Sequence, residues 1–112
     1  MIYFSWLQRY IFHYLAIQSN PKSVLLFEEP EAHVYPVYIK LLAELIGNSK
    51  ERQFFITTHH PLFLTVLMEK AGLQNVNLIQ TRQTKDGSAF EVSTIEEMEK
   101  IFEQDYDAFF QI

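Results

Sequence analysis

Acidic and imidazole side chains gather at two places in this 112-residue chain. Each group follows a short apolar run, and the residues are Glu28, Glu29, Glu31 and His33 in the first group and His59 and His60 in the second. Carboxylates can bind Mg²⁺ and can orient or deprotonate water, while an imidazole can exchange protons near neutral pH. If the two groups share one site, carboxylates and imidazoles meet there and can act together.

The apolar runs before the two groups predict β-strands. Residues 23–27 and 54–58 are too short for helices and are rich in apolar or β-branched side chains. A continuous apolar run is typical of a strand covered on both faces, as in a parallel sheet. Ligands of open α/β sheets bind beyond the carboxyl ends of the strands, so neighbouring strands would bring the carboxylates and imidazoles into one cleft.

Periodic apolar positions predict helices around these strands. Residues 2–17 form an amphipathic helix with Ser5, Gln8, Arg9 and His13 along one stripe, and His13 and His33 are expected on helix surfaces. Residues 33–48 form a second helix that Gly47 ends, and Pro61 begins a third that continues to residue 71. The strand and helix order predicts an α/β fold with mainly parallel strands and flanking helices.

The C-terminal third has the signals of a hairpin followed by a helix. Residues 76–81 and 89–92 predict two strands, and residues 85–88 are a turn signal between them. Thr94 and Glu97 have the spacing of a capping box, which predicts a last helix from residue 95.

Composition limits the chain to one small domain, residues 1–112, with a hydrophobic core. Hydrophobic residues make up 48% and charged residues 21% of the chain. The formal charge is −5 and the nine Lys and Arg residues are scattered, so no direct nucleic-acid footprint is expected. Without cysteine, disulfides and thiolate metal sites are excluded, and we expect a cytoplasmic protein. No membrane segment is expected, because polar residues interrupt the apolar N-terminal stretch.

Two sequence motifs resemble those of one family of ATPases. Residues 24–36, VLLFEEPEAHVYP, are similar to a Walker B stretch of four apolar residues, Asp-Glu-Pro-Glu and a later His-Pro. Residues 55–64, FITTHHPLFL, are similar to a switch-histidine strand with Thr-Thr-His-Ser-Pro. This order and spacing resemble the ABC-type, AAA ATP-binding proteins of recombination, chromosome maintenance and phage defence, including the SMC-like and OLD-like ATPases.

The resemblance implies a role for each matching residue. Glu28 corresponds to the residue that holds Mg²⁺, usually through water, and Glu29 to the carboxylate that polarises the attacking water. His59 corresponds to the histidine that contacts the γ-phosphate of ATP and links it to that carboxylate. The resemblance also implies that Glu31 and Thr58 bind the cofactor. It implies further that the segment around Glu31 crosses to the partner head in a nucleotide-bridged dimer. The chemistry is positioning and charge stabilisation, as phosphoryl transfer requires.

The chain departs from the family pattern in four ways. Glu28 stands where the family has Asp, Tyr35 replaces a His, and His60 replaces a Ser. The sequence also contains no Gly-x-x-x-x-Gly-Lys-Ser/Thr loop, which is the segment that cradles the phosphates. We therefore expect a partial P-loop NTPase sheet without the Walker A strand, in which the 54–58 strand has an open edge. This predicts the C-terminal subdomain of an ATPase head, as a fragment, a decayed product or a subunit that a homodimer or a second ATPase-domain chain completes.

Three other interpretations of these residues remain open at this stage. The acidic stretch at 28–31 is also compatible with a solvated turn after a strand. A decayed ATPase fold could serve as a non-catalytic interaction module. The carboxylates and imidazoles could instead bind a transition metal directly as a hydrolytic or oxidative site, and the residues concerned are Glu28, Glu29, Glu31, His33, His59 and His60.

Overall fold

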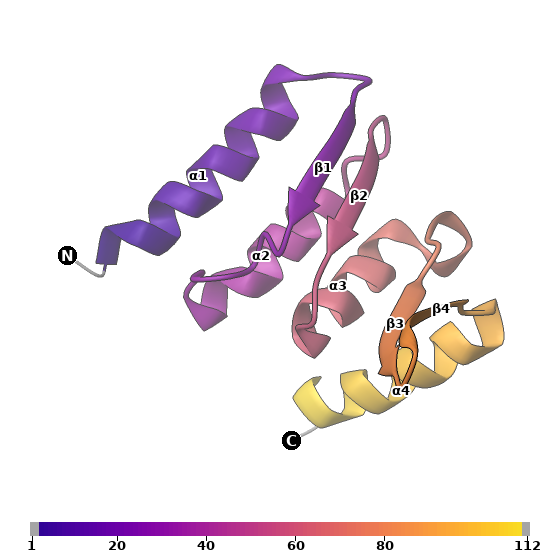
Figure 1. Cartoon of the computed structure of the whole chain (residues 1–112). Coiled ribbons are helices and arrows are strands. Elements are labelled where there is room, and N and C mark those ends of the chain that lie inside the picture. The colour runs from indigo at the N-terminus through magenta and orange to yellow at the C-terminus, as the bar shows by residue number, and fades with distance from the viewer. Residues whose placement is uncertain (1–2, 111–112) are drawn as a thin grey trace.

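The computed structural model describes the backbone of residues 3–110 and the side chains of residues 7–101 and 103. Helices alternate with strands along the chain (Figure 1). The elements are α1 (Tyr3–Ser19), β1 (Val24–Glu28), α2 (Pro36–Gly47), β2 (Gln53–Thr57), α3 (Pro61–Ala71), a 3₁₀ turn η1 (Leu73–Asn75), β3 (Ile79–Thr84), β4 (Gly87–Val92) and α4 (Ile95–Phe110).

The first two strands form a parallel pair, as the sequence predicts. Their register runs from Val24 opposite Gln53 to Glu28 opposite Thr57, so both strands end at the same edge. The hairpin is also confirmed, because β3 and β4 pair antiparallel. It forms a separate two-stranded sheet, so the prediction of mainly parallel strands holds for only one of the two sheets that the described residues form.

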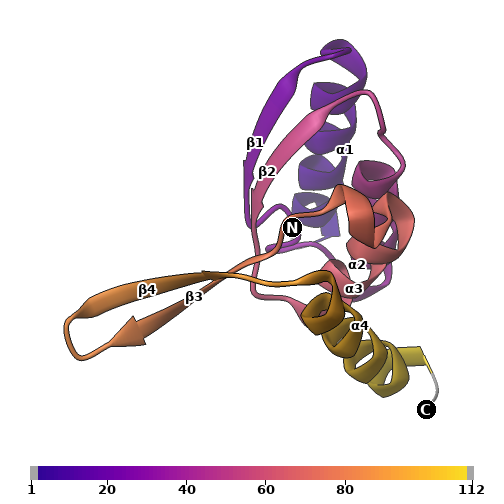
Figure 2. The same cartoon turned by 90° about the vertical axis from the view of Figure 1, so that its right-hand side faces the viewer.

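Helices α1, α2 and α3 lie on one side of the parallel pair and form the core with it (Figure 2). Alternate side chains of the strands face these helices, among them Phe27 of β1. The buried core residues are Ile17, Phe27, Val34, Ile39, Leu42, Ala43, Ile46, Phe63 and Val66. Burial of this apolar surface is the main force that fixes the strands against the helices.

The opposite face of the parallel pair is bare in the described part of the chain. Val24, Leu26 and Phe55 point away from the helices, and Leu26 is 77% exposed. Figure 2 shows no described helix over this face, while the β3–β4 hairpin extends toward the same side. The prediction that the first strand is covered on both faces is therefore wrong for this chain. The continuous apolar run provides two apolar faces, and the described elements cover one of them.

Helix α1 lies against the core in the opposite way from the one its polar stripe predicts. His13 is buried and contacts Phe27 edge to face, with 4.7 Å between ring centroids, whereas Ile11, Phe12 and Leu15 are exposed. The prediction of a surface His13 is wrong, because Arg9 and His13 of the polar stripe face β1 and the loop that follows it, while Gln8 is exposed. Helical periodicity identifies a stripe but does not say which side a neighbouring strand covers.

Local backbone chemistry moves several predicted boundaries. Helix α2 begins at Pro36 instead of residue 33, since Tyr35 is extended (φ −60°, ψ 137°) as a residue before proline prefers to be. His33 therefore lies in a turn, with φ of 62°, and not on a helix. Strand β3 begins at Ile79 instead of residue 76, and Gly87 pairs with Thr84 as the first residue of β4.

Two predicted helix starts agree with the structure. At α4, the backbone N–H of Glu97 donates to Thr94 Oγ1 at 3.2 Å, and Thr94 Oγ1 contacts Glu97 Oε1 at 3.2 Å. At α3, Pro61 occupies the first turn and the ring of His60 accepts from the N–H of Phe63 at 3.4 Å. A helix that is long and apolar enough to cross a membrane does not occur in the described part of the chain.

Candidate functional site

Glu29 and His59 meet at the edge where β1 and β2 end. Nδ1 of His59 lies 2.5 Å from Oε1 of Glu29, although the residues are 30 positions apart. The parallel register explains the meeting, because each residue follows the end of one of two adjacent strands. The His59 and Glu29 side chains are 82% and 42% exposed, so both are accessible to a ligand. An imidazole and a carboxylate in direct contact can orient each other and share a proton.

The contact itself is too weak to fix its own geometry. Exposed ion pairs contribute about 0–1 kcal/mol, which is close to the thermal energy of about 0.6 kcal/mol. The geometry must therefore depend on how the surrounding backbone is held.

The backbone of Glu29 is held in an unusual conformation. Its φ is +43°, a left-handed value that side-chain-bearing residues rarely adopt. Its N–H donates to the carbonyl of Thr57 at 2.8 Å and lies 3.2 Å from the Thr57 hydroxyl. Its carbonyl accepts from the N–H of Ala32 at 2.9 Å and from Nη2 of Arg9 at 3.2 Å. These bonds fix a conformation that costs of order 1–3 kcal/mol when it is unsupported.

Arg9 and Thr57 support the site, and sequence reasoning gave neither a role. Arg9 reaches the Glu29 carbonyl from α1, and Thr57 reaches the Glu29 N–H from the end of β2. The sequence signal for Arg9 is its place in the polar stripe of α1. No local signal identifies Thr57, since its role depends on the strand register.

Glu31 and Thr58, expected in cofactor binding, contact each other. Thr58 Oγ1 donates to Glu31 Oε1 at 2.6 Å and also accepts from the backbone N–H of His60 at 3.2 Å. Glu31 is only 5% exposed, and its Oε2 is buried without a hydrogen-bond partner among the described residues. Leaving a buried polar group without its hydrogen-bond partner costs about 1–3 kcal/mol, more than an exposed ion pair typically contributes. This contact is thus the stronger link between the two strand ends.

Glu28 lies at the end of β1 opposite Thr57 and is exposed. An accessible carboxylate at a strand end is a donor that suits Mg²⁺, which prefers hard oxygen ligands and keeps several waters. His33 is exposed on the turn after β1. His60 caps α3 through its ring, so the structure assigns it a local role.

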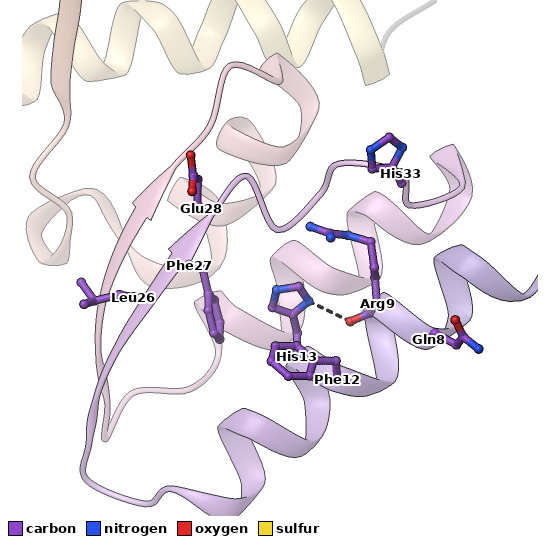
Figure 3. Close-up of a pocket in the computed structure, with 8 residues that line it drawn as sticks. All are labelled: Gln8, Arg9, Phe12, His13, Leu26, Phe27, Glu28 and His33. Atoms are coloured by element: carbon purple, nitrogen blue, oxygen red, sulfur yellow. Dashed lines mark hydrogen bonds between the residues drawn. The ribbon is translucent and has the colours of Figure 1, made fainter.

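A cavity of about 590 Å³ lies between α1 and β1 (Figure 3). Figure 3 shows Phe27 pointing toward His13, with Leu26 directed to the other side of the strand. His13 Nδ1 lies 2.8 Å from the Arg9 carbonyl, and must donate because a carbonyl only accepts. Burial lowers the pKa of His13 below its ordinary 6.5, and the charge of Arg9 adds to this, while the carbonyl hydrogen bond opposes it. His13 is therefore a structural group under β1.

The described residues contain no group of three or more His, Cys, Asp or Glu side chains that could hold a metal ion together. The direct metal-binding interpretation therefore has no support from their arrangement. What the strand ends bring together is an imidazole and a carboxylate in contact, Glu29 and His59.

A parallel strand pair with polar residues at its carboxyl ends and helices on one side fits part of a P-loop NTPase fold. A solved structure, described as "Structural biochemistry of ATP-driven dimerization and DNA stimulated activation of SMC ATPases", has this fold with a TM-score of 0.58 at 24% identity. The match covers 89% of the present chain and 60% of that one. The chain thus spans less than two thirds of the solved ATPase chain.

The chain belongs to the family described as "AAA domain, putative AbiEii toxin, Type IV TA system", whose model matches residues 7–65, more than half of the chain. The matched region contains β1, β2 and both residues of the Glu29–His59 contact. No curated protein matches the chain at a significant level. Fold and family together assign the chain to the P-loop NTPases.

Proposed function

We propose that this chain is part of an ATP-hydrolysing, ABC-type head, in which it supplies the Walker B carboxylates and the switch histidine. The observation that carries the proposal is the 2.5 Å contact between His59 Nδ1 and Glu29 Oε1 at the carboxyl ends of two parallel strands. Catalysis of phosphoryl transfer depends on positioning a water and on placing donors near the phosphate. The exposed carboxylate can position the water, and the imidazole in contact with it can provide the donor near the phosphate.

Each side chain of the contact keeps one group free for a second partner. Glu29 Oε1 is engaged by His59, so Oε2 can accept a proton from an attacking water. When Nδ1 of His59 donates to Glu29, Nε2 is the nitrogen that remains for the γ-phosphate, and it donates in the imidazolium form. The carboxylate thereby orients both the imidazole and the water.

Glu28 is the residue that we propose holds Mg²⁺ through water. Its exposure and its oxygen donors fit this ion, which when bound neutralises charge on the phosphate oxygens. Glu28 is one methylene longer than the Asp it replaces in the family pattern.

We further propose that a polypeptide carrying the phosphate-binding loop completes the head. The bare apolar face of the parallel pair supports this, because exposed apolar patches mark interaction sites. The 60% coverage of the solved ATPase chain agrees with a larger complete unit. That structure is described by its ATP-driven dimerization, and a homodimer or a second ATPase-domain chain is the partner we propose here.

The test compares the isolated chain with a complex containing a polypeptide that carries the Gly-x-x-x-x-Gly-Lys-Ser/Thr loop. We expect little ATP binding by the isolated chain and Mg²⁺-dependent hydrolysis by the complex. Glu29→Gln should lower kcat by roughly 10²–10⁴-fold, the range for loss of a general base. Glu51→Gln is the matched control, since Glu51 is exposed just before the opposite end of β2.

Two outcomes would contradict the proposal. Hydrolysis by the isolated chain that disappears on Glu29→Gln would show that no completing loop is needed. Hydrolysis by the complex that survives Glu29→Gln would remove the assigned base. A complex that forms without any hydrolysis supports the second candidate, a non-catalytic interaction module, which the bare apolar face also favours.

A further inference from the structure

The Glu29–His59 contact lies on the surface, whereas a second contact between the same two strand ends lies beneath it. Glu31 is two residues after Glu29, and Thr58 directly precedes His59. Their side chains meet at 2.6 Å, with Glu31 buried. The buried contact therefore joins the two segments that carry the exposed pair.

We propose that the Glu31–Thr58 hydrogen bond positions His59 against Glu29. This inference rests on the proposed function, in which that pair is catalytic, and makes Glu31 and Thr58 positioning residues. Neither side chain needs to touch nucleotide, because each acts through its neighbour in sequence.

The hydrogen bonds around Thr58 show how this positioning works. The Thr58 hydroxyl donates to Glu31 and accepts from the N–H of His60, so it holds the chain on both sides of His59. The next residue in this chain of contacts is His60, whose ring accepts from Phe63 at the start of α3. His59 thus lies between a fixed strand end and a fixed helix start.

Glu29 is held in a matching way on the other strand. Its N–H bonds to Thr57 on β2, and the segment after it is anchored where Glu31 meets Thr58. Loss of the Thr58 hydroxyl would release the His60 N–H and remove the donor to Glu31 Oε1, while Oε2 already has no partner among the described residues. The backbone bonds of Glu29 would remain, but on the side of His59 the exposed pair would depend on its own weak attraction.

The experiment measures the ¹⁵Nδ1 chemical shift of His59 in the full chain without nucleotide, for Thr58→Val and Thr58→Ser. Glu29→Ala defines the shift of a broken pair. Thr58→Val should move the signal most of the way to that value, whereas Thr58→Ser keeps the hydroxyl and should leave it near wild type. Thr65→Val is the matched control, since Thr65 is a buried threonine of α3.

A second variant guards against loss of the fold. Thr58→Val combined with Glu31→Met replaces both partners by apolar groups, which leaves no buried carboxylate unpaired. The His59 signal should still move in this folded double variant. A wild-type His59 signal in either folded variant, with only a lower denaturant midpoint, would overturn the positioning role.

The same variants separate this inference from the proposed function. In the completed head, Thr58→Val should lower kcat by roughly 10- to 100-fold with little change in KM for ATP, and Thr58→Ser should restore it. A shifted His59 signal without any hydrolysis by the wild-type complex would retain the positioning and refute the ATPase role. An unchanged kcat together with a shifted signal would overturn the catalytic importance of the positioning.

Discussion

Gly47 of α2 packs directly against α3, and Gly47→Ala tests that packing. It is the last residue of α2 and is buried. A Cβ at this position would lie 2.6 Å from the Cβ of Lys70, 3.2 Å from the N of Ala71 and 3.3 Å from the carbonyl of Leu67. All three atoms belong to α3.

The expected loss follows from these distances. Carbon atoms pack best at about 3.5–4.0 Å, so the helices must separate by roughly 1 Å. A rotamer change does not help, because the Cβ of Lys70 is fixed to the helix backbone. Overpacking of this kind costs about 1–3 kcal/mol, while alanine gains at most about 1 kcal/mol in helix propensity. We expect Gly47→Ala to lower the free energy of unfolding by about 1–2 kcal/mol.

Urea unfolding followed by circular dichroism measures this change. Lys70→Gly removes the nearest atom, so Gly47→Ala should be milder in that background, with a coupling of about 0.5 kcal/mol or more. Lys70→Ala keeps the Cβ and is the matched control. A Gly47→Ala protein as stable as wild type, or an equal loss in the Lys70→Gly background, would refute the close-packing argument.

Three further predictions concern single residues. His13→Phe should weaken the pH dependence of stability below pH 6.5. Because the folded chain lowers the pKa of His13, the unfolded chain binds the proton first as the pH is lowered. The free energy of unfolding therefore decreases as the pH falls from 6.5 to the folded-state pKa, by at most about 1.4 kcal/mol per pH unit. Exposed His33→Gln should keep that dependence, and an unchanged slope in His13→Phe would contradict it. Thr94→Ala should lower stability by about 0.5–2 kcal/mol through loss of the α4 cap, whereas Thr94→Ser should not. Phe63→Ala should lower it by about 3–5 kcal/mol, since the ring is fully buried, and a loss below 1 kcal/mol would exclude a packed core there.

The sequence alone was sufficient for features that depend on neighbouring residues. Short apolar runs identified β1 and β2, Pro61 located the start of α3, and Thr94 with Glu97 located the start of α4. The sequence also predicts that Glu29 and His59, which each follow a strand, lie close together, because neighbouring parallel strands end at the same edge of the sheet. These signals act over a few residues, so no knowledge of packing was needed.

Only the tertiary structure decided the features that depend on segments far apart in the chain. Whether His13 is buried depends on which side of α1 faces Phe27, and whether Leu26 is covered depends on where the helices lie. The contact of Glu31 with Thr58 depends on strand register. The sequence predicts Gly47 as the end of a helix, yet the position must be small because it packs closely against Lys70, 23 residues away. Periodicity and propensity describe one element at a time, whereas burial and contact arise between elements, and this is the physical reason for the division.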